Sequence, residues 1–564
     1  MATALNEKGA MARRLQSQCL ALFTSGLLRD TEAKTVLTKF DGAWKENPDL
    51  AMKILLHARD CRGGKGERKA VMVALGWLRK NKPKTYSANL ASFIEHGCYR
   101  DLVQLAAQAD PKNKGGGVVG ELELGMLCEQ LKADVVALRK PKETKLKNDE
   151  NKMAKEAKAG VSISLAAKWA PTEGGKYDKK DGPRLAKRLA CLMFPDIQTP
   201  KKQYRLMLSE LRGHLKVVEK LMVARQWKAI EFDKVPSRAH NLYKKAFRKH
   251  AGEEYAKFIG DVKTGKKTIK AKAMQPHELV KYFLDRKHLI GKKESLEKLT
   301  HKVCPACTLH NRISATLCEV CGGRLPSNAD SKSLGAEAET VEAQWRSLVE
   351  GLRTDGCLKD AMAVVDVSGS MHGQPMEVSI AMGILVSQLA NAPFHGRLVT
   401  FAEKPKWHRV PVETKSLAQM TKSVANMEWG ANTNIERVFN LLLTTAVQHK
   451  LPQEALPKTL FIFTDMQFDA AAGTSENETV IELVKKRFAK AGYTLPRIIL
   501  WNLRTANTDG YPVSENESGV AMVSGFSADL LRNFMRGKIM TPLEQMLKTV
   551  GGYASKVVVA EDER

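Results

Sequence analysis

The sequence predicts a multidomain protein with an α-helical N-terminal region, a small four-cysteine zinc finger and a C-terminal α/β domain. Its 564 residues are too many for one hydrophobic core. From about residue 10 to residue 300, apolar side chains recur with a period near 3.6. Four cysteines then cluster between positions 304 and 321, and short apolar runs alternate with helical patterns after residue 345.

The helical region is expected to span residues 1–300 as stacked helices, for which a HEAT-like arrangement is one option. Its helical periodicity is clearest in four segments: 20–23, 51–56, 70–75 and 215–221. Residues 139–158 consist mostly of Lys, Glu, Asn and Ala, which indicates a charged insertion, either a solvated helix or a disordered segment. The sequence leaves open whether the helices close into a ring.

The positive charge lies almost entirely in the first part of the chain. Residues 1–330 contain 65 Lys and Arg against 36 Asp and Glu, a net charge of +29, whereas residues 331–564 contain 25 against 26, a net charge of −1. This asymmetry predicts a polyanionic partner for the N-terminal part, with RNA favoured and a membrane surface as the competing interpretation. No apolar run reaches the ~20 residues that span a bilayer, and a signal peptide is not evident. We therefore expect an intracellular protein, cytoplasmic or nuclear, without membrane insertion.

A glycine-rich basic loop is the candidate phosphate-binding segment of the helical region. Its cations are Arg59, Arg62, Lys65 and Arg68, and glycine backbone can approach a phosphate closely while such side chains neutralise it. The spacing is not that of a nucleotide P-loop. The alternative is an interhelical turn with charged flanks. Three further basic segments, 176–188, 201–202 and 263–272, fit either a nuclear address or a solvated face.

The cysteine cluster predicts a zinc site. Cys304, Cys307, Cys318 and Cys321 form two CxxC pairs separated by ten residues, a spacing that closes a tetrahedron of thiolates. A set of four thiolates without an open position indicates structural zinc. We place this finger at residues 301–326 and a linker at 327–344, which becomes helical near Trp345.

The α/β domain is expected to span residues 345–564. Five apolar runs predict its strands and three amphipathic runs predict helices between them, an alternation that indicates parallel strands with helices on both faces. The expected strands are 361–365, 397–401, 460–464, 497–501 and 519–523, and the expected helices include 376–390, 435–449 and 480–489.

Oxygen-bearing side chains follow two of these strands. Asp366, Ser368 and Ser370 come directly after the first strand, Asp465 ends a later one, and Thr433 lies in a loop between them. Carboxyl ends of parallel strands share one edge of a sheet, and Mg²⁺ prefers oxygen ligands. The five residues therefore predict a Mg²⁺ site. The plainer alternative is a strand-to-turn junction in which Asp366 caps the next helix.

These five positions resemble the von Willebrand factor A domain and its metal-ion-dependent adhesion site. The resemblance implies that the hydroxyls and one carboxylate coordinate Mg²⁺, that the other carboxylate often acts through water, and that an acidic side chain of a protein partner completes the octahedron. The zinc cluster, with Asn311 between its pairs, resembles the Ran-binding-protein-two-type zinc finger, although Lys302 replaces the usual Trp. One branch of that family binds single-stranded RNA and another binds ubiquitin; Thr308, Leu309 and Val320 correspond to the apolar patch of the ubiquitin branch, whereas Lys302, Arg312 and Arg324 suit phosphates. The alternative is a zinc-stapled spacer without a ligand.

The order of the regions resembles the Ro autoantigen (TROVE-like) architecture, in which a helical ring binds noncoding RNA. A closer resemblance is to an uncharacterised family of plants, protists, fungi and large viruses that joins such a helical region to an A domain. The segments that carry it include 59–68, 167–171, 235–237, 366–371, 429–433, 464–469, 501–503 and 523–527. The zinc finger looks like an insertion.

Two functions remain open at this stage. The first is a noncatalytic RNA-binding scaffold whose A domain recruits a protein partner through Mg²⁺. The second is a ubiquitin-binding adaptor that acts through the zinc finger and the A domain. An enzymatic role is not expected, because no nucleophile-and-base set is evident. The sequence cannot name the RNA or the partner, and it does not reveal the oligomeric state.

Overall fold

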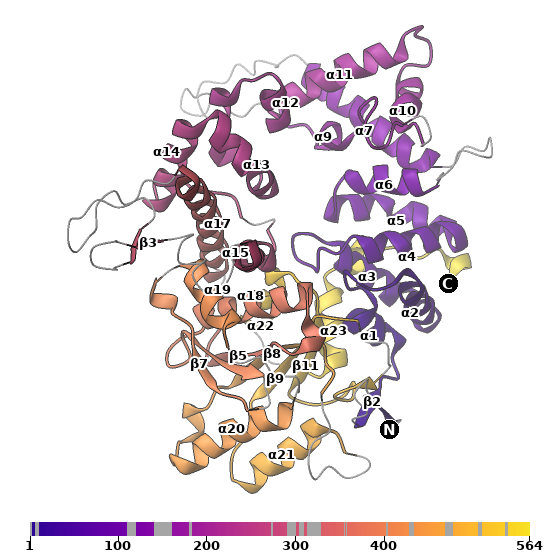
Figure 1. Cartoon of the computed structure of the whole chain (residues 1–564). Helices are drawn as coiled ribbons and strands as arrows, with labels where there is room; N and C mark the ends of the chain where they lie inside the picture. Colours follow the sequence, from indigo (N-terminus) through magenta and orange to yellow (C-terminus); the bar gives the residue numbers. More distant parts are fainter. Residues whose placement is uncertain are drawn as a thin grey trace, which may run out of the picture. The chain divides into compact units, whose positions relative to one another are not determined.

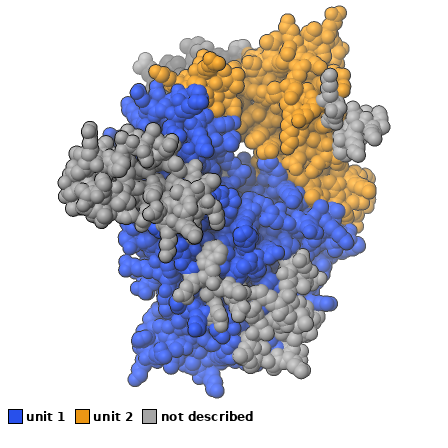
Figure 2. Space-filling model, in the orientation of Figure 1, with its two compact units in different colours: residues 1–71, 231–557 blue, residues 72–230, 558–564 orange. Residues whose placement is uncertain are grey.

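The protein is described by a computed structural model of the whole chain (Figure 1). The structure describes residues 3–5, 11–109, 120–139, 161–179, 183–271, 274–289, 301–303, 310–312, 329–354, 356, 358–401, 404–414, 416–427, 434–468, 478–505, 510–535 and 540–564. They form two compact units, residues 1–71 with 231–557 and residues 72–230 with 558–564 (Figure 2). The units do not divide at residue 300, because the first 71 residues belong with the C-terminal part.

The first unit is built around a six-stranded sheet. Its strands are β5 (Ala361–Asp366), β6 (Arg397–Phe401), β7 (Trp407–Arg409), β8 (Thr459–Thr464), β9 (Arg497–Asn502) and β11 (Val520–Ser524). The order is β11-β9-β8-β5-β6-β7, and every neighbouring pair is parallel except β6 with β7. Such strands are buried on both faces, which explains their continuous apolar runs. The expected α/β region is thereby confirmed, with strand limits within one residue of the predicted ones.

Helices cover both faces of this sheet. In Figure 1, α18 (Gln374–Leu389) lies on one face, and α20 (Ile435–Gln448) and α21 (Val480–Lys490) lie on the other. Asn434 caps α20, and Thr479 with Glu482 forms a capping box on α21. α18 packs very close to β5, since a Cβ at Gly383 would lie 2.3 Å from Cγ2 of Val365. The remaining elements after β5 are short or peripheral: η4 (Gly369–Met371), η5 (Val412–Thr414), α19 (Leu417–Ala425), η6 (Gln453–Ala455), β10 (Gly510–Tyr511), η7 (Ala528–Leu531), α22 (Arg532–Met535), α23 (Pro542–Gly551) and η8 (Ala554–Lys556).

A helical layer precedes the sheet in sequence and packs onto the helices α18 and α19. It consists of η3 (Phe232–Lys234), α13 (Ser237–His250), α14 (Gly252–Lys263), α15 (Pro276–Leu289) and α17 (Ala329–Arg353). α15 lies against α18 and α19. The helix α17 begins at Ala329, so it includes most of the segment expected to be a linker. A short hairpin, β3 (His301–Val303) with β4 (His310–Arg312), lies between α15 and α17 in sequence.

The N-terminal segment also belongs to the first unit. It contains β1 (Thr3–Leu5), β2 (Met11–Arg14), α1 (Gln18–Ala21), the π-helix η1 (Leu22–Gly26), α2 (Ala33–Glu46) and α3 (Pro48–Arg59). β2 pairs with β10, and Arg13 donates two hydrogen bonds to the carboxylate of Glu482, at 2.8 and 2.9 Å. Residues almost 500 positions apart in sequence thus form one core.

The second unit is helical, as expected for this part of the N-terminal region. Its elements are α4 (Lys69–Asn81), most of which lies in this unit, α5 (Pro83–His96), α6 (Arg100–Ala109), α7 (Glu121–Arg139), α9 (Ala166–Trp169), α10 (Leu185–Met193), α11 (Pro200–His214), α12 (Val218–Val223), η2 (Trp227–Ala229) and η9 (Glu561–Glu563). Arg212 fixes the loop after α9 by donating to the carbonyls of Ala167 and Ala170. The C-terminal residues join this unit because Glu563 accepts hydrogen bonds from the amides of Lys84 and Thr85 at the start of α5. Among the described residues, no helix is both long and apolar enough to cross a membrane.

Candidate metal centre

Asp366 and Asp465 end neighbouring strands at the point where the strand order reverses. If the six strands are numbered 1 to 6 by their order in the sequence, β5 is strand 1 and β8 is strand 4. Their order across the sheet is then 3-2-1-4-5-6. Open α/β sheets bind ligands outside the carboxyl ends of their strands at such a switch point. Asp366 is the last residue of β5, and Asp465 directly follows β8. The fold therefore brings together the two carboxylates that the sequence placed at strand ends.

The carboxylate of Asp366 is buried and held by the backbone and side chains of both strands. Its Oδ1 accepts a hydrogen bond from the amide of Ser368 at 2.9 Å, and its Oδ2 accepts one from the hydroxyl of Thr464 at 2.9 Å. The side chain has no solvent exposure. Burial, together with the nearby charge of Asp465, raises the pKa of Asp366 to about 7. Two carboxylates close together in a dry site require a positive partner if both are to be ionised.

Asp465 has one oxygen without a hydrogen-bond partner among the residues that the structure describes. Its Oδ1 accepts a hydrogen bond from the amide of Gln467 at 3.0 Å, whereas its Oδ2 is buried and unpaired within the described part of the chain. Buried polar atoms are normally paired, so an orphaned carboxylate oxygen needs an explanation such as an absent ion. The side chain is 2% exposed. This oxygen is the observation that best fits a cation beside the two carboxylates.

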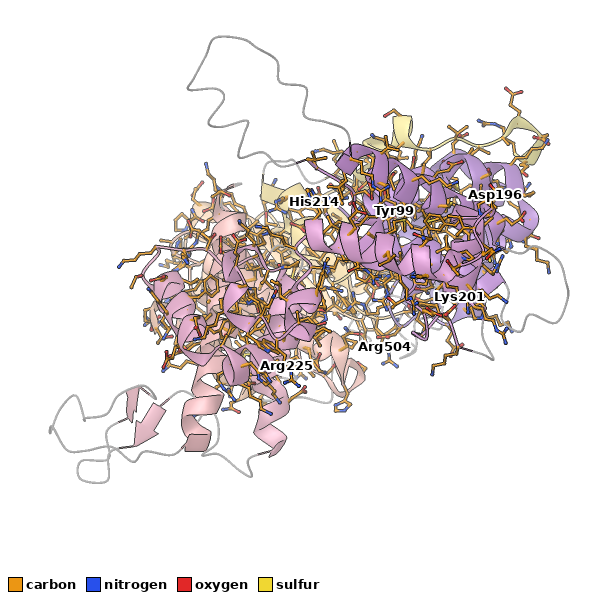
Figure 3. The ribbon with its side chains drawn as sticks, turned by 90° about the horizontal axis from the view of Figure 1, so that it is seen from above. Tyr99, Asp196, Lys201, His214, Arg225 and Arg504 are labelled. Carbon is orange, nitrogen blue, oxygen red and sulfur yellow. The ribbon has the colours of Figure 1, made fainter. Side chains whose placement is uncertain are left out.

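Hydroxyl groups complete one side of the candidate centre. The Oγ atoms of Ser368 and Ser370 lie 3.1 Å apart at the start of the loop after β5. The guanidinium of Arg504, two residues beyond β9 and labelled in Figure 3, donates to the carbonyl of Ser370, and the two atoms lie 2.7 Å apart. Thr433, the fifth predicted ligand, lies outside the described residues. The structure therefore gathers four of the five predicted ligands in one region.

This donor set suits a hard cation. Carboxylate and hydroxyl oxygens are the groups that Mg²⁺ selects, and a set with few protein ligands leaves positions for water or a partner's oxygen. Within the described ranges, no group of three or more His, Cys, Asp or Glu side chains gathers as candidate metal ligands. The centre instead combines two carboxylates with hydroxyls.

The other half of the same sheet edge is covered by the N-terminal segment. Asn502, the last residue of β9, donates from its side-chain amide to the carbonyl of Thr24 at 3.0 Å. Ser524, the last residue of β11, donates to the carbonyl of Phe23 at 2.8 Å. Lys65 donates to the hydroxyl of Ser524 at 2.6 Å and also to the carbonyl of Phe23. The ends of β9 and β11 are therefore occupied by protein.

The glycine-rich basic loop is folded back on the end of α3. Arg59 and Lys65 are buried, Arg68 is half-buried and Arg62 is exposed. A Cβ at Gly64 would lie 1.9 Å from the carbonyl oxygen of His57, so glycine is needed for this close approach. The ammonium of Lys65 is used inside the core, because it lies 4.8 Å from the ring centroid of Phe23 as well as near Ser524. Of the four predicted phosphate contacts, Arg62 is the one that is exposed at the described surface.

The zinc site predicted from the sequence lies outside the described residues. This holds for Cys304, Cys307, Cys318 and Cys321 and for the ubiquitin-patch residues Thr308, Leu309 and Val320. Residues 140–160, which include nearly all of the predicted charged insertion, also lie outside them.

The sequence did not lead us to several residues at the carboxyl edge of the six-stranded sheet. Thr464 was included only in a strand, although its hydroxyl binds Asp366. Arg504 was not singled out, and its position two residues after an apolar strand was the available signal. No sequence signal indicated that Asn502 and Ser524 would bind the N-terminal segment, since those contacts join positions 478 and 501 residues apart.

Two family models match the chain. One, described as Domain of unknown function (DUF2828), matches residues 6–115 and 125–358, and another, Domain of unknown function (DUF7788), matches residues 360–562. The chain is also 32% identical, over 570 aligned positions, to "Uncharacterized protein L728" of Acanthamoeba polyphaga mimivirus. That alignment covers 97% of this chain and 87% of the relative. Both the helical and the α/β parts are thus shared with a viral protein.

Proposed function

Because this chain belongs to the DUF2828 family, we propose a function from its own residues: a noncatalytic scaffold that binds an acidic protein ligand through a divalent cation. Asp366, Ser368, Ser370 and Asp465 hold the cation in this proposal, and Thr433 joins them. A bound Mg²⁺ supplies an open position for a carboxylate oxygen of the partner. The site lies where α/β sheets bind ligands, and the resemblance to the von Willebrand factor A domain points to the same chemistry.

The orphaned Oδ2 of Asp465 is the single observation that carries this proposal. Its neighbour Asp366 has a raised pKa because the carboxylate is buried, and the charge of Asp465 adds to this effect. A divalent cation offsets both effects at once. A purely structural role for the two carboxylates leaves the oxygen without a partner.

The experiment is a thermal unfolding series of the full chain with MgCl₂, with CaCl₂ and with EDTA. A cation that binds the folded chain raises its unfolding temperature, by the equivalent of about 2.7 kcal/mol at 100 times Kd. We expect Mg²⁺ to raise it in the native sequence and not in Asp366→Ala. Glu454→Ala serves as the control, because this exposed carboxylate precedes β8 at the opposite edge of the sheet. An equal rise in Asp366→Ala would overturn the proposal.

An RNA-binding role for the helical unit is a second part of the proposal. Residues 72–230 contain 31 Lys and Arg against 17 Asp and Glu, a net charge of +14. On α11, Lys201, Lys202 and Arg205 are exposed in the first two turns (Figure 3 labels Lys201). Glu173 is the carboxylate paired with two of them, Lys201 at 3.8 Å and Arg205 at 3.4 Å. This group therefore retains positive charge for backbone phosphates.

Filter binding with single-stranded RNA at several salt concentrations tests this part. Replacing Lys201, Lys202 and Arg205 together by Gln is expected to weaken binding and to reduce the salt slope by about 0.7 for each phosphate that the variant no longer neutralises. A matched triple variant of exposed cations in the first unit, Lys450, Lys458 and Lys490, is the control. If both variants bind RNA like the native chain, the helical unit is not the RNA-binding part.

We also propose that Cys304, Cys307, Cys318 and Cys321 hold a structural zinc ion. The support is the spacing of the two CxxC pairs, which suits a tetrahedral thiolate site. Ubiquitin binding through Thr308, Leu309 and Val320 depends on this finger being formed, because so small a module needs its metal to fold.

A further inference from the structure

A pocket of about 860 Å³ lies in the first unit, apart from the candidate metal centre. It is bordered by the loop that follows α14, by the C-terminal half of α17, and by the residues around the start of β6 and the end of β7 (elements in Figure 1). Gly396, which lines it, precedes β6, whereas Asp366 ends the parallel strand β5. The pocket therefore lies towards the opposite edge of the sheet. Its volume is in the range of small-molecule sites.

The deep wall of the pocket is apolar and fixed in place. Trp345, Val349, Ile269 and Val410 line it and are each at most 5% exposed. Nε1 of Trp345 donates to Oε1 of Gln388 at 2.8 Å, which anchors α17 to α18. The hydroxyl of Ser347 donates to the carbonyl of Ile269 at 2.9 Å, which anchors the loop after α14 to α17. Hydrogen bonds therefore join the elements that form the pocket.

The charged side chains of the lining are predominantly basic. Lys263, Lys267, Arg346, Arg353 and Arg409 contribute five cations, against two carboxylates, Glu350 and Glu413. Each of these carboxylates already faces an arginine of the same lining, Glu350 at 4.0 Å from Arg353 and Glu413 at 3.8 Å from Arg409. Lys263 pairs with Glu339 at 2.6 Å. The lining thus has more positive charge than its own carboxylates neutralise.

Two of the five cations have no carboxylate within ion-pair distance among the residues that the structure describes. These are Lys267, in the loop after α14, and Arg346, on the exposed side of α17. The Arg346 charge acts on the buried carboxylate of Glu342, but Glu342 binds the amides of Leu417 and Ala418. An arginine held on a helix presents its guanidinium to a phosphate or carboxylate in a defined geometry.

We propose that this pocket binds a small amphipathic organic anion, with its phosphate or carboxylate group on Arg346 and Lys267 and its apolar ring or chain against Val349, Ile269 and Val410. The combination of an apolar wall with uncompensated cations fits this ligand class. A fully polar anion leaves the apolar wall exposed to water, and a neutral apolar ligand leaves the cations unused. The site also gives a role to the basic segment 263–272, which neither the cation centre nor the RNA-binding surface uses.

The test is calorimetric titration of the full chain with three probes: adenosine monophosphate, sodium decanoate and inorganic phosphate. The first two carry an anionic group on a ring system and on an alkyl chain, so they distinguish the two sources of this chemistry. We expect one of them to bind more tightly than inorganic phosphate. The double variant Arg346→Gln with Lys267→Gln is expected to weaken that binding at least about ten-fold, the effect of losing charge-assisted hydrogen bonds.

Lys266→Gln is the matched control, because Lys266 is an exposed cation of the same loop that does not line the pocket. It is expected to bind the preferred probe like the native chain. The unfolding temperature of every variant establishes that the fold is intact. Three results would overturn the proposal. Neither organic probe binds, or inorganic phosphate binds at least as tightly as each organic probe, or the double variant binds the preferred probe as tightly as Lys266→Gln does.

Discussion

The hydroxyl of Thr464 donates to Oδ2 of Asp366 at 2.9 Å, which joins the last residue of β8 to the last residue of β5. The bond holds the two strand ends in register where the strand order reverses. Together with the Ser368 amide, which donates to Oδ1, it fixes the orientation of the Asp366 carboxylate. The candidate centre is therefore held in place by the sheet itself, and rigid elements position ligands better than loops do.

Gly383 allows α18 to approach β5 closely, and Gly383→Ala is expected to destabilise the protein. A Cβ there would lie 2.3 Å from Cγ2 of Val365, in a fully buried contact. We expect a loss of about 1–3 kcal/mol of unfolding free energy, as for other overpacked cores. Gly260→Ala is the control, since Gly260 has no heavy atom within 4 Å of an added Cβ and is exposed on α14. It is expected to be neutral or stabilising by up to ~1 kcal/mol. Urea denaturation of both variants measures the difference, and equal effects would contradict the close packing.

His57 is expected to make the fold sensitive to acid. Burial, with a smaller effect of the Lys65 charge, lowers the pKa of His57 to about 3. Both ring nitrogens are buried without hydrogen bonds, and the ring stacks on Phe23 at 5.6 Å between centroids. Between pH 6.5 and 3 the unfolded chain binds a proton that the folded chain does not, so unfolding free energy falls as pH falls through this window.

His57→Phe is expected to reduce that dependence, because a phenyl ring keeps the stacking and cannot be protonated. Urea denaturation at a series of pH values from about 7, just above the window of the shift, to about 5, inside it, compares the variant with the native chain. His449→Phe, at an exposed position after α20, is the control. If the unfolding free energy of His57→Phe depends on pH as strongly as that of the native chain, His57 is not buried as described.

Lys65 is expected to act in the same direction as His57, but on the alkaline side: its burial also makes the unfolding free energy rise with pH. Burial lowers its pKa to about 7, and Glu67 offsets part of this effect. Above about pH 7 the unfolded chain keeps a proton that the folded chain releases, so unfolding free energy rises with pH until the ordinary lysine pKa is reached. Lys65→Met removes the group. The stability difference between the native chain and Lys65→Met is therefore expected to shift in favour of the native chain from about pH 7 towards about pH 9. A constant difference across this range would mean that Lys65 is not desolvated.

The sheet was predictable because its strands are buried on both faces. Continuous apolar runs such as 361–365 and 460–464 mark such strands, and the acidic residue after each marks the carboxyl end of the strand. The strand β7 was missed because Trp407 and Arg409 are exposed and the strand has three residues. Its pairing depends on β6 and not on its own pattern.

The burial of Lys65 in the glycine-rich basic loop was not predictable from the local sequence. Lysine is almost never fully buried, so Lys65 in a glycine-rich segment indicated a surface contact. The structure instead places its ammonium at the end of β11, beside Ser524, 459 positions away. No periodicity encodes a contact of that range. The same reason explains why residues 1–71 were assigned to the helical region and are found with the α/β part.

The predicted zinc site gives a prediction that does not depend on the fold of the rest. Elemental analysis of the purified chain is expected to find one zinc ion per chain, held by Cys304, Cys307, Cys318 and Cys321. Cys304→Ser with Cys318→Ser is expected to lose it, whereas Cys61→Ser with Cys191→Ser, both exposed cysteines outside the cluster, is expected to keep it. If Cys304→Ser with Cys318→Ser retains the zinc content of the native chain, the predicted zinc site is wrong.

Calorimetric titration of Mg²⁺ into the native chain and into Asp465→Asn tests the central claim most directly. The substitution keeps an oxygen that can accept the hydrogen bond from the Gln467 amide. It removes the negative charge that repels the carboxylate of Asp366. We predict that the native chain binds Mg²⁺ at this site, and that Asp465→Asn binds it at least about ten-fold more weakly while unfolding at a higher temperature in EDTA. Absence of Mg²⁺ binding to the native chain, or equal binding by both proteins, would contradict a cation centre at Asp366 and Asp465.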